Sequence, residues 1–169
     1  ASHDLDFVWD DLGRKVTQVT AEAGTMRMVY NEAGNLVEKV EAYGSGDQKT
    51  TTYAYDHANR LLSVNTGDAV CFTSGGPEIQ YSYDALPAGV SCPGGSTCNL
   101  LAGRLAYAKV KVMCDDTKAD DTFDQETFYS YDEAGRLTQH TVKDDSGRTG
   151  LVSYTYDKNS HPTRINPPA

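Results

Sequence analysis

The side chains that most often carry out catalysis are few and scattered in this sequence. Its four histidines are His3, His57, His140 and His161, and none has a serine or cysteine nucleophile at a recognisable spacing. Glycoside hydrolysis needs two carboxyl groups in different environments on either side of a cleft. Adjacent acids such as Asp10-Asp11 do not identify such a pair. We therefore expect no catalytic residues and no enzymatic activity.

Metal and cofactor sites are equally poorly supported. The segment from Asp115 to Asp124 has five aspartates, but it lacks the ligand spacing of an EF-hand loop. Neither Gly44-Ser45-Gly46 nor Gly94-Gly95 precedes the lysine of a phosphate-binding loop. We expect a solvated acidic loop here, and no metal or cofactor.

The four cysteines favour disulfide chemistry over metal binding, because paired Cys-x-x-Cys motifs are absent. Four cysteines allow three connectivities, and free thiols remain an alternative. The close spacing of Cys92 and Cys98 suits a small closed loop, so we favour the pairs Cys92–Cys98 and Cys71–Cys114. Disulfides would place the protein in an oxidising compartment.

Charge and composition exclude several partners. The net charge is −9 and the pI is about 4.8, whereas nucleic acids and anionic membranes bind clustered Lys and Arg. No apolar run approaches the roughly 18 residues of a membrane span. Eleven tyrosines against four phenylalanines, together with abundant glycine, indicate strands and turns rather than helices.

A recurring motif organises the chain: aromatic-x-aromatic-Asp-x-x-Gly-Arg-Leu. Large residues alternate before the aspartate, as a strand with one buried face requires. The aspartate can then cap a turn, and the glycine can adopt the left-handed conformation that the turn needs. Each copy therefore predicts one β-hairpin. The motif residues are Trp9, Asp10 and Gly13; Tyr30 and Gly34; Tyr55, Asp56 and Arg60; Tyr83, Asp84, Gly103 and Arg104; Tyr131, Asp132, Gly135 and Arg136; and Tyr156 and Asp157.

The motif predicts a single all-β domain over residues 1–169, an array of consecutive antiparallel hairpins. Two insertions interrupt the regular spacing of the motif, one at 86–101, within the fourth turn, and one at 115–125. Neighbouring hairpins must stabilise one another, because a lone hairpin is marginal. We expect the tyrosines to pack against adjacent hairpins rather than to bind sugar rings.

The sequence resembles the YD-repeat, or Rhs-repeat, family. The resemblance rests on Tyr55-Asp56-His57-Ala58-Asn59-Arg60-Leu61 and Tyr131-Asp132-Glu133-Ala134-Gly135-Arg136-Leu137. Tyr83-Asp84 with Gly103-Arg104-Leu105 adds an interrupted copy. The family includes Rhs toxins, Tc toxin shells, wall-associated bacterial proteins and teneurins. The resemblance implies that the hairpins form a curved, spiralling sheet, which in the family winds into hollow shells that enclose toxins or support adhesion.

The resemblance implies a non-enzymatic structural segment of a larger secreted or cell-surface shell-like protein, bacterial and extracellular or periplasmic. Since 169 residues are too few to close a shell, its partners would be neighbouring repeats of a parent protein, or further copies through the sheet edges. The alternative is a stand-alone adhesion module that recognises glycan or protein through its inserted loops. A remnant of a toxin system is a third hypothesis, although no toxin domain is visible.

Overall fold

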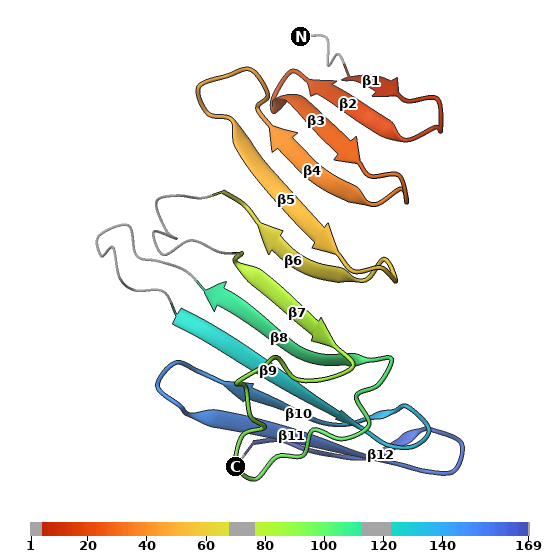
Figure 1. The fold of residues 1–169 in the computed structure, drawn as a ribbon, viewed down its shortest axis with the longest axis vertical. Helices are drawn as coiled ribbons and strands as arrows, with labels where there is room; N and C mark the ends of the chain where they lie inside the picture. The colour runs from red at the N-terminus through yellow and green to blue at the C-terminus, as the bar shows by residue number, and fades with distance from the viewer. Residues whose placement is uncertain (1–4, 68–76, 113–122, 169) are drawn as a thin grey trace. The chain divides into compact units, whose positions relative to one another are not determined.

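The computed structural model describes residues 5–67, 77–112 and 123–168, and all regular structure among them is β-strand. The chain divides into two compact units, Ala1–Pro77 and Glu78–Ala169. The predicted all-β class and the consecutive antiparallel hairpins are confirmed (Figure 1).

The described part of the first unit contains six strands, and consecutive strands within it are hydrogen-bonded in antiparallel fashion. They are β1 (Leu5–Trp9), β2 (Lys15–Thr20), β3 (Gly24–Tyr30), β4 (Leu36–Glu41), β5 (Lys49–Tyr55) and β6 (Leu61–Asn65).

The second unit repeats this meander with six further antiparallel strands. They are β7 (Ile79–Tyr83), β8 (Leu105–Val112), β9 (Phe123–Tyr131), β10 (Leu137–Lys143), β11 (Thr149–Tyr156) and β12 (Pro162–Asn166). Because β9 begins at Phe123, the last residues of the expected 115–125 loop are strand, while 113–122 lie outside the described residues.

The motif sets the hairpin boundaries. In every repeat the first strand ends on the aromatic residue before the Asp or Asn: Trp9, Tyr30, Tyr55, Tyr83, Tyr131 and Tyr156. The return strand begins directly after the Arg, Asn or His position. The register shifts by one residue beside each of these turns, as expected of a type I turn followed by a left-handed residue that forms a bulge.

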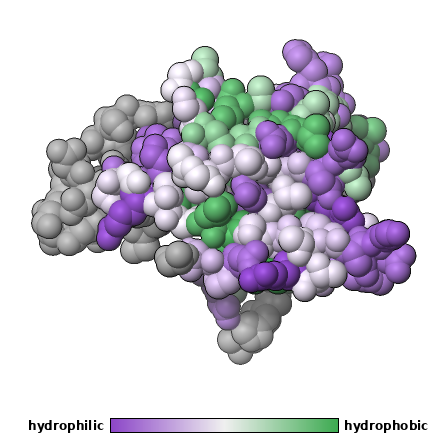
Figure 2. Space-filling view, turned by 90° about the horizontal axis from the view of Figure 1, so that it is seen from below, coloured by the Kyte–Doolittle hydropathy of each residue, from purple (hydrophilic) through white to green (hydrophobic). Residues whose placement is uncertain are grey.

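Buried apolar side chains are few, as expected for hairpins arranged in a single layer. Among the described residues of the first unit they are Met28 and Val40. The second unit has more, with Ala106, Tyr107, Ala108 and Phe128, and the rings of Tyr107 and Phe128 meet edge to face at 5.2 Å. Hydrophobic residues therefore remain at the surface, and they gather in patches on the face seen in Figure 2.

Candidate functional site

The repeated structural site of this protein is the hairpin corner, the five residues from Asp to Arg. In the first corner, Oδ1 of Asp10 accepts the backbone N–H groups of Leu12 and Arg14 at 3.0 and 2.9 Å. Its Oδ2 accepts Nε of Arg14 at 2.7 Å. The backbone closes the turn as well, since the N–H of Gly13 donates to the carbonyl of Asp10 at 2.9 Å. One carboxylate thus fixes both ends of the corner.

The same geometry recurs along the chain. At Asp56 the distance to Nε of Arg60 is 2.6 Å, and at Asp132 the distance to Nε of Arg136 is 2.7 Å. At Asp157 a histidine, His161, replaces the arginine, and its Nδ1 lies 3.2 Å from Oδ2. The residue before the Arg position has a positive φ in each case, whether it is a glycine or another residue: Gly13, Asn59, Gly135 and Ser160.

The corner contacts keep the carboxyl groups ionised. The backbone N–H four residues on, followed by the side chain of that same residue, holds the pKa of Asp10 below its ordinary value. The pKa values of Asp56, Asp132 and Asp157 are lowered mainly by the equivalent backbone N–H, against partial desolvation.

Neighbouring hairpins are joined by a tyrosine hydroxyl. The hydroxyl of Tyr30 donates to the carbonyl of Lys15, the first residue after Arg14, at 2.9 Å. The equivalent bond recurs in both units at 2.7–3.0 Å, from Tyr55 to Leu36, Tyr131 to Leu105 and Tyr156 to Leu137. The motif tyrosine therefore binds the preceding repeat, which accounts for its recurrence.

An arginine of the preceding corner stacks on three of these four tyrosines, Tyr30, Tyr131 and Tyr156. The guanidinium of Arg136 lies 4.9 Å from the ring centre of Tyr156, and its NH1 donates to the carbonyl of Asp157 at 3.0 Å. In the same way, the guanidinium of Arg14 stacks on the ring of Tyr30 and donates to the carbonyl of Asn31. We call the tyrosine hydrogen bond together with the stacked arginine the inter-repeat bridge. In the second repeat Asn35 replaces the arginine and instead donates to Asn59 at 2.7 Å.

The fourth corner is split but still closed. Asp84 and Arg104 are joined by a backbone hydrogen bond of 3.0 Å, and the N–H of Gly103 donates to Oδ1 of Asp84 at 2.6 Å. The backbone adapts to the insertion, because Asp84 and Leu100 both have positive φ. The chain thus leaves the sheet at this corner and returns to it without breaking the hairpin.

The inserted residues 86–101, which we call the strap, fold back over β9 and β10 (the green loop in Figure 1). Cys92 and Cys98 form a disulfide within the strap. Hydroxyl groups attach the strap to the sheet: Ser96 bonds Thr141 at 2.7 Å and Thr97 bonds Ser130 at 2.9 Å. The expected pair Cys71–Cys114 lies outside the described residues.

The strap covers polar rather than apolar side chains. Ser130 and Thr141 are each 1 % exposed, and the strap residues provide hydrogen-bond partners for both. Gln139 also accepts the N–H and the hydroxyl of Thr97, both at 2.8 Å. Ser130 and Thr141 were not recognised as a docking surface, although two buried polar side chains on neighbouring strands need hydrogen-bond partners.

A row of charges extends across the same face of β8, β9 and β10. Glu126 accepts the hydroxyl of Tyr107 at 2.6 Å and pairs with Lys143 at 2.9 Å. Lys109 pairs with Asp124 at 2.6 Å. Burial and the bond to Glu126 raise the pKa of Tyr107, and those two donors keep the pKa of Glu126 low despite partial desolvation. Each carboxylate therefore has a partner in the sheet.

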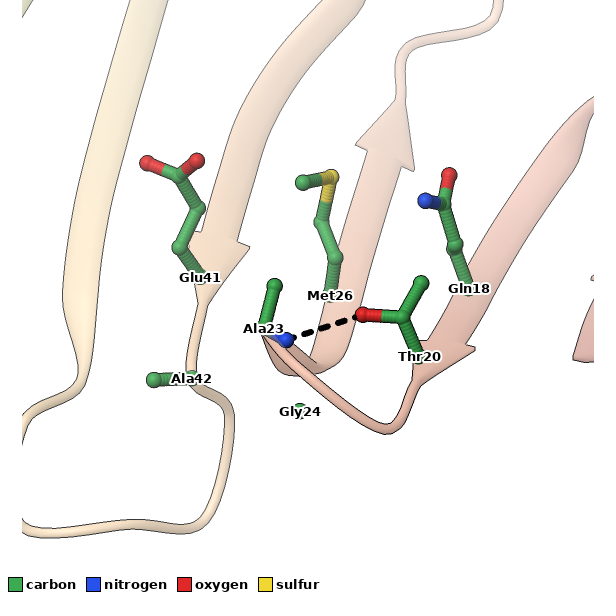
Figure 3. A pocket seen from close by; sticks show the side chains of 7 residues that line it. All are labelled: Gln18, Thr20, Ala23, Gly24, Met26, Glu41 and Ala42. Atoms are coloured by element: carbon green, nitrogen blue, oxygen red, sulfur yellow. Dashed lines mark hydrogen bonds between the residues drawn. The ribbon is translucent and has the colours of Figure 1, made fainter. Parts of the chain in front are cut away.

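Two depressions on the described surface differ in size. One, of about 40 Å³, lies between the turn after β2 and the end of β4 (Figure 3). The hydrogen bond drawn there, from the N–H of Ala23 to Oγ1 of Thr20 at 3.0 Å, is internal to the turn. That volume suits a water molecule, whereas small-molecule pockets are usually several hundred cubic ångströms. The other, of about 350 Å³, reaches that size but is a hollow open to solvent, lined by Gln125, Val142, Asp144, Arg148, Thr149 and Gly150. No cluster of metal-binding side chains occurs among the residues that the structure describes.

The structure distributes the predicted motif residues over six corners rather than bringing them into one site. Two further features, both at the corners, went unrecognised in the sequence. The role of the arginine as a bridge was missed, and so was a further corner at Asp144–Arg148, where the carboxylate accepts the N–H and Nε of Arg148 at 2.8 and 3.0 Å. The sequence does indicate this further corner, because Asp144-Asp145-Ser146-Gly147-Arg148 repeats the Asp-x-x-Gly-Arg spacing.

Comparison with known proteins supports the fold. No family model and no curated protein matches the sequence. A crystal structure of TcdB2-TccC3-Cdc42 is similar over 94 % of this chain and 7 % of its own, with a TM-score of 0.61 and 19 % identity. A Photorhabdus luminescens Tc holotoxin pore structure is similar over 96 % of this chain and 8 % of its own, with a TM-score of 0.67 and 14 % identity.

These neighbours are Tc toxin structures, so the expected resemblance to YD-repeat shells is confirmed at the level of the fold. The chain spans less than a tenth of the length of either matched chain. Among the described residues, no helix is long and apolar enough to cross a membrane.

Proposed function

We propose that this chain is a structural segment in the wall of a larger secreted or cell-surface shell-like protein of the toxin-scaffold type, and that it carries out no catalysis. The observation behind the proposal is the tyrosine hydrogen bond of the inter-repeat bridge, which recurs in both units from a motif tyrosine hydroxyl to the carbonyl that follows the preceding corner. Residues that bind the preceding repeat serve an extended array rather than a single ligand.

The fold similarity supports the same assignment. In the Tc toxin structures, a region of this fold makes up 7–8 % of a much longer chain. A region of this kind would form part of the wall of the shell. Its natural partners are other repeats of the parent protein or other subunits of a toxin complex. Secretion agrees with the strap disulfide, since such bonds persist in oxidising compartments.

An immunoblot of fractionated source cells, with an antibody raised against this chain, tests the proposal. We expect a band several-fold larger than the 18.4 kDa of this chain, outside the cytoplasm. A band near 18.4 kDa, or a cytoplasmic one, would contradict it.

The strap favours a second candidate function, an adhesion module that recognises glycan or protein. It is the one long excursion among the described hairpins, and its disulfide and hydroxyl contacts fix its outer surface, where Leu100 is 48 % exposed. Deleting residues 86–101 joins Ala85 to Ala102 and restores the sequence Tyr-Asp-Ala-Ala-Gly-Arg-Leu, an uninterrupted corner. If the protein is an adhesin, this deletion abolishes cell-surface or glycan-array binding while the β-sheet circular-dichroism signal remains.

A further inference from the structure

Phe128 of β9 is almost completely buried, although a single layer of strands cannot bury both of its own faces. Its side chain is 1 % exposed, and that of Tyr107, its register partner on β8, is 3 % exposed. Its register partner on β10 is Thr141, and Ser130 follows it two residues along β9. Cross-strand partners and residues two apart share a face of a sheet. These four side chains therefore lie on one face, and a segment outside the sheet must cover it.

The strap is attached to this face at both neighbours of Phe128. The hydroxyl of Ser96 bonds that of Thr141 at 2.7 Å, and the hydroxyl of Thr97 bonds that of Ser130 at 2.9 Å. In Figure 1 the strap is the green loop that passes over β9 and β10. It is thus the described segment in position to shield Phe128.

The docking part of the strap is the loop that its disulfide closes. The described hydrogen bonds from the strap to β9 and β10 come from Ser96 and Thr97, inside the Cys92–Cys98 loop, and from Asn99 directly after it. Each such bond adds only modest net stability, because its groups bond water when they separate. The closed loop limits the conformations open to the strap, and that restriction favours the docked state.

We propose that the Cys92–Cys98 disulfide is a redox latch. While the bond is intact, it holds the strap over Phe128 and Tyr107, and its reduction lets the strap lift and uncovers the two rings. This inference goes beyond the proposed structural role, because it makes one face of the sheet respond to the redox state of its surroundings.

The chemical step is thiol–disulfide exchange with a dithiol reductant. One thiolate of the reductant attacks a sulfur of the bond to form a mixed disulfide, and the second thiol of the reductant then displaces it. Cys92 and Cys98 become two thiols, having gained two electrons and two protons, and the reductant becomes a disulfide. Both cysteines are partly exposed, and Gly94 and Gly95 of the loop are exposed, so a reductant can reach the bond.

The open state satisfies its polar groups. Once the strap has lifted, water can replace it as the partner of Ser130 and Thr141, so no polar side chain of this face is left buried without a hydrogen bond. What the open state newly exposes is apolar: the rings of Tyr107 and Phe128, which meet edge to face at 5.2 Å.

Fluorine NMR tests the latch, with the four phenylalanines replaced by 4-fluorophenylalanine. The chain carries Cys71→Ser and Cys114→Ser, so that Cys92–Cys98 is the one bond that dithiothreitol can break. The difference in chemical shift between H₂O and D₂O reports the contact of each ring with water. Phe128→Leu assigns the resonance of Phe128. Phe7, which is 39 % exposed and lies in the first unit, is the control.

We expect the Phe128 resonance of the oxidised chain to show almost no isotope shift. After reduction the shift should rise toward that of a chain lacking residues 86–101, and glutathione disulfide should reverse the change. The isotope shift of Phe7 should be the same in both states. A Cys92→Ala/Cys98→Ala variant of the otherwise unchanged chain should show the raised shift without reductant, and it serves if the serine background does not fold.

An unchanged Phe128 shift in the reduced chain, beside a raised one in the deletion variant, would overturn the inference, because the disulfide would then hold nothing closed. So would an unchanged shift in the deletion variant, since the strap would not be the cover. Loss of the β-sheet circular-dichroism signal on reduction would also overturn it, because the bond would then hold the fold rather than the strap. The proposed function is judged separately, by the immunoblot.

Discussion

The arginine that follows each turn residue connects two repeats at once. Arg136 pairs with Asp132 in its own corner, stacks on Tyr156 and donates to the carbonyl of Asp157. Exposed ion pairs alone contribute little, whereas a cation against an aromatic face adds about 0.5–1 kcal/mol. The contribution of this arginine to the stability of the fold therefore depends on the next repeat as much as on its own repeat.

We predict that Arg136→Ala lowers the free energy of unfolding by about 1–2 kcal/mol, from the lost stacking and ion pair together. Arg148→Ala is the matched control. Arg148 makes the same pair with Asp144, but its side chain is 82 % exposed and no described ring covers it, so we expect less than about 0.5 kcal/mol. Urea unfolding of the two variants measures the difference, and equal losses would show that the stacking adds nothing.

The corner carboxylates predict a pH dependence. The pKa values of Asp10, Asp56, Asp132 and Asp157 are lower in the fold than their ordinary value of 3.8, chiefly because of backbone N–H donors. A depressed folded-state pKa gives stability that is present above the ordinary value and lost as the pH falls through the folded-state value.

We therefore expect the thermal midpoint to be unaffected by these groups between pH 7 and pH 5 and to fall below about pH 4. Asp132→Asn should lower the midpoint at neutral pH and reduce the steepness of its acid decline. A midpoint that already drops by pH 5, in parallel in the wild type and the variant, would mean that other groups control acid stability.

At the level of elements, hairpin boundaries were predictable from sequence and the path of the insertion was not. The boundaries depend on contacts four residues apart, such as Asp132 with Arg136, and these recur wherever the motif recurs. The left-handed position also tolerates Asn59 and Ser160, which a strict glycine rule would miss. Where the strap lies depends on contacts 31–45 residues apart, and no local pattern encodes them.

The strap should become mobile when its disulfide is removed. The bond closes a loop with a sequence separation of 6, which corresponds to about 2 kcal/mol of chain entropy. In a Cys92→Ser/Cys98→Ser variant, we expect the amides of Thr97 and Asn99, which donate to Gln139 and Ser130, to exchange hydrogen roughly 30-fold faster.

The amide of Asp144 serves as the control for that exchange experiment, because it donates to the carbonyl of Arg148 in a corner that has no described hydrogen bond with the strap. Its exchange should be unchanged. If Asp144 accelerated as much as Thr97, the disulfide would be stabilising the whole unit rather than the strap alone.

At the level of the whole molecule, the two units differ in how much they bury. The second unit has the buried rings of Tyr107 and Phe128 packed against each other, whereas the described part of the first unit relies on Met28 and Val40. Repeat arrays lose cooperativity when neighbouring segments differ in stability. The composition alone did not predict this difference, because both halves contain the same motif.

We expect the first unit to unfold at lower urea concentration than the second. Trp9 is the sole tryptophan and lies in the first unit, so the anisotropy of its emission follows that unit alone, while far-ultraviolet circular dichroism follows both. The urea concentration at the midpoint should be lower when unfolding is followed by fluorescence than when it is followed by circular dichroism. Coincident midpoints would instead indicate one cooperative transition through all twelve strands.

The split corner also has a use in protein engineering. Asp84 and Arg104 remain joined by their backbone hydrogen bond although the chain makes a long detour between them. Because loop-closure entropy rises slowly, at roughly 0.6 kcal/mol for each doubling of length, longer guests should be accepted there too. A folded domain whose termini lie close together, grafted in place of residues 86–101, would then be displayed from the sheet while the pairing of β7 with β8 is preserved.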